Sequence, residues 1–141
     1  MSSTSHRDLR VWQSAIEIAA ECYAVVKLFP KDELFGLTSQ IRRAAASVPA
    51  NIAEGYGRYS RKETIRFLNI ANGSLNELDT HLELARRAGY LSDATVESLT
   101  AKGRSLGAQM FAFKAALRRP SKQPPQAPLP RPPAIASATA P

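Results

Sequence analysis

The chain has 141 residues, 44% of them hydrophobic, which suffices for one compact domain and is too short for two of ordinary size. Its 19 lysines and arginines against 12 acidic residues give a net charge of +7, a balance that suits anionic partners. The single cysteine, Cys22, excludes an internal disulfide, and two histidines leave too few ligands for a Cys/His zinc site. No signal peptide and no membrane span of roughly 20 apolar residues is evident, so we expect a cytoplasmic protein.

Residues 1–7 are expected to form a flexible N-terminus ahead of a folded domain over residues 8–119. In this domain, apolar side chains recur every three or four residues in four blocks, the spacing of one face of a helix. The predicted core positions are Leu9, Trp12, Ile16, Ala19, Tyr23 and Val26; Ile41, Ala45, Val48, Ile52, Gly55 and Tyr59; Leu68, Ala71, Leu75, Leu78, Leu82 and Ala85; and Val96, Leu99, Gly103, Leu106, Met110, Phe113 and Leu117.

Local signals mark the ends of these helices. Asp8 is a plausible cap for the first helix, and Ser60 followed by Glu63 is a capping box that opens the third. Gly89 is expected to close the third helix and Ser92 to cap the fourth. Because short connections force neighbouring helices to be antiparallel, the sequence predicts an all-α, antiparallel up-down-up-down four-helix bundle.

Nine of the ten prolines bear on the predicted structure: one lies inside a predicted helix and eight lie near the C-terminus. Pro49 lies inside the second block, where it removes a backbone hydrogen bond and predicts a kink over residues 45–49. Eight of the ten prolines lie from Pro120 onward, so we expect residues 120–141 to form a disordered Pro-rich C-terminal tail. Its "PLPRPP" stretch is either solvated, the favoured reading, or a ligand for a proline-recognising groove.

The predicted topology separates charge between the two ends of the bundle. One end contains the N-termini of the first and third helices and the C-termini of the second and fourth. It carries nine basic and three acidic residues, a net charge of +6. The opposite end carries four bases and six acids, a net of −2. We call the first of these the basic end; its nine bases are Arg7, Arg10, Arg58, Arg61, Lys62, Arg66, Lys114, Arg118 and Arg119.

Cations at the start of the third helix oppose its macrodipole, whereas its exposed N–H groups attract anions. A phosphate bound there would receive both backbone N–H groups and charged side chains, and Tyr56 and Tyr59 could stack on an unpaired base. The alternative is a solvated basic face with Tyr59 in the core. The predicted nucleic-acid-binding residues are Arg58, Arg61, Lys62, Arg66, Arg7, Arg10, Arg118, Arg119, Tyr56 and Tyr59.

A stripe of amides runs beside the apolar stripe of the third helix. Asn69, Asn72 and Asn76 can hydrogen-bond across to another helix, either within the bundle or between subunits. A solvent-facing strip is the alternative, but an exposed helix face usually favours Glu and Lys over three asparagines. We therefore expect these three residues at an interface of a homo-oligomer.

Catalytic motifs are missing from the sequence. Glu77 and His81 are four residues apart and occur once, whereas a di-metal carboxylate bundle needs two Glu-x-x-His elements. The sequence contains no phosphate-binding glycine loop, and Cys22 has no neighbouring histidine and looks like a small apolar core residue. We predict no enzyme activity, no cofactor and no metal site.

Three long stretches, "LRVWQSAIEIA", "FGLTSQIRRAAASVPANIAEGYGRYSRKE" and "FLNIANGSLNELDTHLELARRAGYL", carry a family resemblance. Over about residues 8–118 the chain resembles the four-helix-bundle proteins encoded in intervening sequences of bacterial 23S rRNA genes. The resemblance extends to the accessory variability proteins of diversity-generating retroelements, which form pentameric barrels and bind reverse transcriptase and nucleic acid. It implies a four-helix bundle and assembly into a pentamer, and it transfers no catalytic residue to this chain.

Two functions fit these observations. The first is a non-enzymatic, oligomeric accessory protein that binds RNA or DNA through the basic end. The alternative is a protein–protein interaction scaffold, for example accessory to a reverse transcriptase or a ribosome-associated partner, in which positive charge serves solubility. The separation of charge favours the first function, because a scaffold has no need for it.

Overall fold

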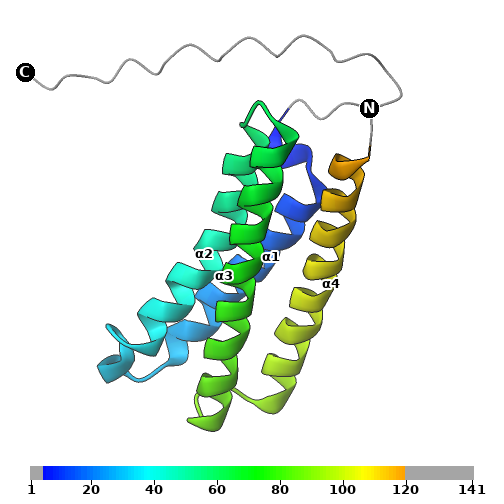
Figure 1. Ribbon diagram of the computed structural model, residues 1–141. Helices are drawn as coiled ribbons and strands as arrows, with labels where there is room; N and C mark the ends of the chain where they lie inside the picture. Colours follow the sequence, from blue (N-terminus) through cyan, green and yellow to red (C-terminus); the bar gives the residue numbers. More distant parts are fainter. Residues whose placement is uncertain (1–4, 120–141) are drawn as a thin grey trace, which may run out of the picture.

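The computed structural model describes residues 5–119, and within them the predicted all-α, antiparallel four-helix bundle is confirmed (Figure 1). The four helices are α1 (Arg10–Val25), α2 (Leu37–Tyr56), α3 (Arg61–Arg87) and α4 (Asp93–Arg118). Three short 3-10 helices, η1 (His6–Asp8), η2 (Val26–Leu28) and η3 (Lys31–Glu33), lie before and after α1. Each α-helix packs against its neighbours in sequence, and α4 closes the bundle against α1.

Ser60, Gly89 and Ser92 mark helix ends as predicted, although only the Ser60 half of the predicted capping box forms. The Ser60 hydroxyl accepts a hydrogen bond from the Glu63 amide at 3.0 Å, and the Ser92 hydroxyl accepts one from the Thr95 amide at 3.1 Å. Gly89 adopts a φ of 81°, and the amides of Gly89 and Tyr90 donate back into the last turn of α3, an arrangement that favours glycine. These ends are set by residues close together in sequence.

The predicted Asp8 cap is wrong. The chain forms η1 before α1 begins, and Asp8 is the last residue of this short helix. The N-cap of α1 is therefore Leu9, whose apolar side chain makes no capping hydrogen bond. Ser5 caps η1 instead, accepting a hydrogen bond from the Arg7 amide at 3.2 Å.

The core runs the length of the bundle and contains most of the predicted positions. All six positions predicted on α3 are buried, as are the five on α2 from Ile41 to Gly55. The largest fully buried side chains are Ile41, Ile52, Leu68, Leu78, Leu106, Met110 and Cys22.

Three predicted core residues are exposed. Ile16 and Tyr23 are 39% and 42% exposed, because α1 turns the adjoining stripe of Ala15, Ile18 and Cys22 toward the core. Tyr59 is 49% exposed, because α2 ends at Tyr56 and leaves Tyr59 in the connection to α3. The repeat of three and four residues thus located the helix and four of its six predicted core positions, but it placed Ile16 and Tyr23 in the core wrongly.

The end of α2 lies very close to the start of α3. A methyl group on Gly55 would approach the Cβ of Phe67 to 2.9 Å, so only glycine fits at this contact. The Thr64 hydroxyl donates to the Gly55 carbonyl at 2.9 Å, which ties the two helices together. This joint determines where the side chains of the α2–α3 connection lie.

Other predictions about the chain remain open. α2 continues as one helix across Pro49, which is buried, and the kink stays a prediction. The tail at 120–141 and the first four residues of the predicted flexible N-terminus lie outside the described residues. None of the helices in residues 5–119 has both the length and the apolar character that a membrane span requires.

Candidate nucleic-acid interface

The four helix ends that carry the predicted binding residues lie together at one end of the bundle (Figure 1). The Nη1 of Arg61, in the first turn of α3, donates to the carbonyl oxygen of Arg119 after α4 at 3.1 Å. About two turns further along α3, the Nζ of Lys114 donates to the Oδ1 of Asn69 at 2.9 Å. These two contacts join α3 to α4 and bring the cations of both helices to one surface.

Two arginines of the basic end stack on a single aromatic ring. The guanidinium carbons of Arg58 and Arg66 lie 4.7 Å and 4.6 Å from the centre of the Phe67 ring. Arg58 also forms an ion pair with Glu54, and Arg66 forms one with Glu63 at 3.2 Å. Both guanidinium groups are therefore held in place, and their side chains remain about half exposed.

Residues 60–62, at the N-terminus of α3, are exposed. Ser60 satisfies the Glu63 amide, whereas the carboxylate of Glu63 turns to Arg66, so only one half of the predicted capping box is seen. The amides of Arg61 and Lys62 have no partner within the helix, as at any helix N-terminus. Arg66 compensates the one acidic side chain of this turn, which makes the site more favourable for an anion.

Other predicted cations are exposed at this end. Lys62, Arg10 and Arg118 are exposed and form no ion pair within the described residues. Arg7 is also exposed, and its guanidinium carbon lies 5.3 Å from the centre of the Trp12 ring. The cations without an ion pair thus come from α1, α3 and α4. The two arginines that stack on Phe67 come from the α2–α3 connection and from α3.

The two predicted stacking tyrosines differ in exposure. Tyr56 is the last residue of α2 and is half-buried, whereas Tyr59 is exposed in the connection. Tyr59 is therefore the one whose ring is open to a base from solvent.

At the opposite end of the bundle, two of the four cations are neutralised by acidic side chains. Glu83 accepts hydrogen bonds from both Arg86 and Arg87, and Arg86 also reaches Asp93 at 3.3 Å. The hydrogen bonds from Arg86 and then Arg87 lower the pKa of Glu83 to about 2. The other two cations of this end, Lys27 and Lys31, are exposed and form no ion pair within the described residues, so this end has fewer free cations than the basic end.

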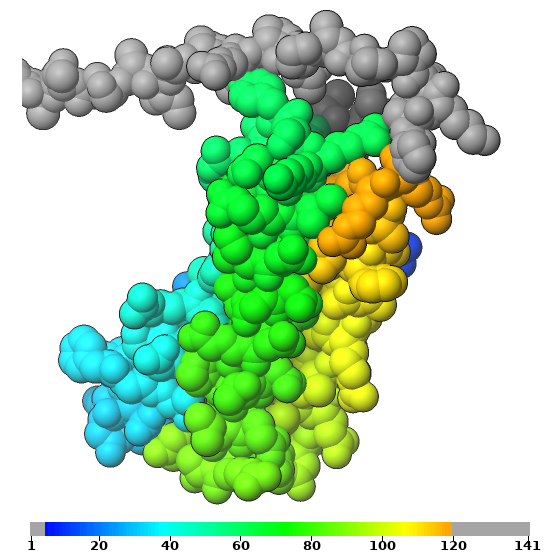
Figure 2. All heavy atoms as spheres, viewed as in Figure 1, coloured from blue at the N-terminus to red at the C-terminus, as the bar shows by residue number. Residues whose placement is uncertain are grey.

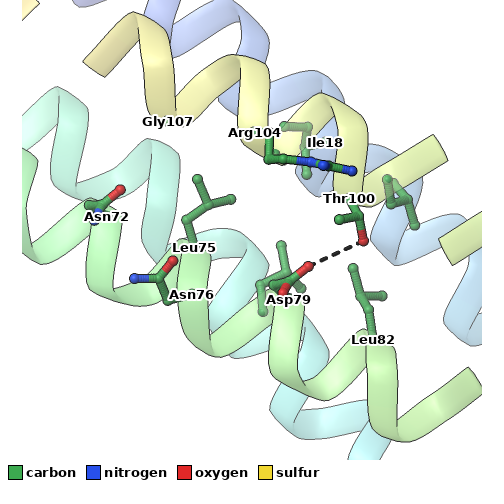
Figure 3. A pocket seen from close by; sticks show the side chains of 12 residues that line it. Ile18, Asn72, Leu75, Asn76, Asp79, Leu82, Thr100, Arg104 and Gly107 are labelled. Atoms are coloured by element: carbon green, nitrogen blue, oxygen red, sulfur yellow. Dashed lines mark hydrogen bonds between the residues drawn. The ribbon is translucent and has the colours of Figure 1, made fainter. Parts of the chain in front are cut away.

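The predicted interface asparagines border a groove between α3 and α4. Asn72 and Asn76 line this groove of about 520 Å³, which has leucines on its floor and Gly103 and Gly107 on its α4 side (Figure 3). Asp79 accepts a hydrogen bond from Thr100 at 3.2 Å across it. Asn69 contacts Lys114 within the bundle, so one of the three amides already serves an intramolecular contact.

Residues with catalytic potential are few. Cys22 is fully buried in the core, and burial raises the pKa of its thiol to about 12, which keeps it protonated at neutral pH. Within residues 5–119 no group of three or more His, Cys, Asp or Glu side chains is placed to hold a metal ion. His81 lies 3.3 Å from Glu77 on the same helix, a contact of one turn.

Sequence reasoning missed the role of Phe67. The adjacent Arg66 offers a weak signal, but Arg58 is nine residues away and reaches the same ring only because the α2–α3 connection folds back. It also missed the dependence of this connection on Gly55.

Fold and surface together define a small four-helix-bundle protein with a basic end. Residues 7–112 match the family described as 23S rRNA-intervening sequence proteins, and the chain belongs to this family. It is similar to a crystal structure from Bacteroides thetaiotaomicron, described as a protein with unknown function from the S23 ribosomal protein family. The two are 27% identical with a TM-score of 0.66, over 74% of this chain and 97% of that chain. No curated protein matches this chain.

Proposed function

We propose that this protein is a non-enzymatic, cytoplasmic accessory protein that assembles into a homo-oligomer and binds RNA or DNA through its basic end. The observation that carries the proposal is the Arg61–Arg119 contact, which gathers the cations of α3 and α4 on one surface. The family's link to 23S rRNA genes supports a nucleic-acid partner. The resemblance to accessory variability proteins supports an assembly of five copies.

In this proposal, some cations that contact phosphate are held in place by an aromatic ring, and others are not. Arg58 and Arg66 are held against Phe67, so they would lose little conformational freedom on contacting a phosphate. Lys62 has no such partner and lies beside the open amides of the helix N-terminus, where a phosphate oxygen would be attracted by both. Such contacts read the phosphate backbone and carry no direct information on base sequence.

The test removes two unpaired cations from the basic end and compares the change in nucleic-acid affinity with that caused by removing two cations from the opposite end. The variant Lys62→Gln with Arg118→Gln is compared with Lys27→Gln and Lys31→Gln, which removes the same charge from the opposite end. Affinity is measured by fluorescence anisotropy over a range of salt concentrations, on duplex DNA and on single-stranded RNA.

We expect the first variant alone to bind more weakly and with a flatter salt dependence. If each cation contacts one phosphate, the slope of log affinity against log salt changes by about 1.8 on duplex DNA and about 1.4 on a single strand. Equal effects of the two variants would mean that only net charge matters. An unchanged affinity and slope in the first variant would remove the basic end from the mechanism.

A protein-interaction scaffold is the second candidate, and the α3–α4 groove is the observation that favours it. Its leucine floor and amide border provide apolar contact together with directional hydrogen bonds, as in a groove that binds a peptide or helix. A partner such as a reverse transcriptase or a ribosome-associated protein would then be recognised there. In that case Asn76→Lys would abolish partner binding and leave nucleic-acid affinity unchanged.

A further inference from the structure

An apolar groove lies on the outer side of α1 and α2. Its volume is about 440 Å³, and every residue that lines it is apolar or aromatic: Trp12, Ile16, Ala19, Ala20, Tyr23, Ala46, Pro49, Ala50 and Ala53. On α2 only alanines and a proline line it, so the hollow exists because the side chains there are small. Ile16 and Tyr23 are among the exposed large apolar residues of the chain. We call this surface the α1–α2 groove.

An apolar projection lies on the connection between the same two helices. Phe35 is 94% exposed and Leu28 is 88% exposed, so both side chains are almost wholly in water. We call these two residues the apolar knob. The connection that carries them extends from the side of the bundle (Figure 2).

The knob is exposed although its backbone is well held. The Phe29 amide donates to the Val26 carbonyl at 3.1 Å, and the ring of Phe29 packs on that of Tyr90 at 5.4 Å. On the other side of the knob, the Gly36 amide donates to the Glu33 carbonyl at 3.0 Å and the Leu37 amide to the Glu33 carboxylate at 3.0 Å. A connection held at both ends presents Phe35 and Leu28 in a defined place, which lowers the entropy cost of docking them.

We propose that the apolar knob of one copy of this chain fills the α1–α2 groove of another. The groove and the knob are matched in chemistry, because both are apolar, and Ile16 and Tyr23 of the groove are exposed as the knob is. The knob and the groove are different surfaces, so the contact is head-to-tail and, when repeated, closes a ring or extends a filament. The proposal rests on the homo-oligomer of the proposed function and names the surfaces that form it.

The knob would act as the anchor of a larger contact. A buried aromatic side chain removes about 150–250 Å² from water, whereas a stable interface buries about 800 Å² on each partner. The surface around Ile16 and Tyr23 has to supply the remainder. Aromatic anchors at the centre of an interface usually carry a large share of the affinity, so removing Phe35 should have a large effect.

The first experiment measures molecular mass by light scattering at tens of micromolar protein, without nucleic acid. We expect the parent protein to be oligomeric, and both Phe35→Ser and Ala50→Arg to be monomeric. Ala50 is exposed in the groove, so arginine there blocks the knob without entering the core. The matched controls are Phe111→Ser, at a phenylalanine 70% exposed on α4, and Ala101→Arg, also exposed on α4. Both controls should keep the parent mass.

The second experiment mixes the two monomeric variants. Phe35→Ser retains an intact groove and Ala50→Arg retains an intact knob, so an equimolar mixture should form a one-to-one dimer. This pairing has one knob–groove contact and should disappear if both substitutions are placed in the same chain. Circular dichroism on each variant checks that the bundle is folded.

Three results would overturn the proposal: a monomeric parent, an unchanged mass in the folded variants, or a mixture that stays monomeric. An oligomer that Asn72→Lys dissociates and Phe35→Ser does not would place the interface in the α3–α4 groove. Because mass is measured without nucleic acid, failure of phosphate binding leaves these outcomes unaffected. A monomeric parent would also overturn the homo-oligomer of the proposed function, whereas an unchanged mass in the folded variants would overturn only the knob–groove contact.

Discussion

Arg61 and Arg119 join the beginning of α3 to the end of α4 through a side chain to backbone hydrogen bond of 3.1 Å. The contact is exposed, so its contribution to the free energy of unfolding is small, but it links the chain after α4 to the first turn of α3. Arg61 therefore combines two tasks in the proposed interface: it offers a charge, and it positions Arg118 and Arg119.

We predict that Arg61→Ala loosens the last turn of α4 with little loss of global stability. Hydrogen exchange at the amides of residues 115–119 should accelerate, while the free energy of unfolding falls by about 1 kcal/mol or less. Lys62→Ala is the matched control, because Lys62 is exposed in the same turn and pairs with no acidic side chain in the described region. Equal exchange rates in the two variants would contradict the positioning role.

A pair of glycine substitutions tests the joint between α2 and α3. Gly55→Ala should destabilise the protein by about 1–3 kcal/mol, because the new methyl group would lie 2.9 Å from the Cβ of Phe67 and 3.3 Å from the Thr64 carbonyl oxygen. Gly107→Ala, in the interior of α4, meets nothing within 4 Å and should stabilise by about 0.5–1 kcal/mol. Urea unfolding of both variants measures the difference, and a stabilising Gly55→Ala would show that the helices can separate without cost.

The ion pairs of Glu83, at the end of the bundle opposite the basic end, predict how stability depends on pH. The pKa of Glu83 is lowered from 4.5 to about 2, so its contribution is fully present above about pH 4.5 and is lost as the pH falls toward 2. Glu83→Gln should therefore be less stable than the parent at neutral pH, and the gap should narrow as the pH falls through this window. Urea unfolding at several pH values measures it.

The control for this prediction is Glu97→Gln, an exposed carboxylate of α4 that forms no ion pair within residues 5–119. Its stability relative to the parent should change less over the same pH range. If the difference in free energy of unfolding between the parent and Glu83→Gln stays constant from pH 7 to about 2, Arg86 and Arg87 do not stabilise the carboxylate.

The sequence alone determined the number of helices, most of their ends and most of the core. Ser60, Gly89 and Ser92 act on backbone groups within a few residues of themselves, so their effect is readable before the chain is folded. All six positions of the apolar repeat of α3 are buried, whereas Ile70 and Leu84, which lie outside the repeat, are 40% and 51% exposed. The charge of the basic end followed from the same count of helices, because topology alone assigns each helix end to one end of the bundle.

The tertiary structure decided which of several apolar side chains are buried and which distant residues come into contact. α1 has two adjoining apolar stripes, and only packing against α2 and α4 turned Ala15, Ile18 and Cys22 inward and left Ile16 and Tyr23 outside. Phe67 became the support for Arg58 because Gly55 permits a close turn between helices, a distance that no local pattern encodes. Periodicity and capping are properties of neighbouring residues, whereas burial and side-chain contact depend on segments that meet only after the chain has folded.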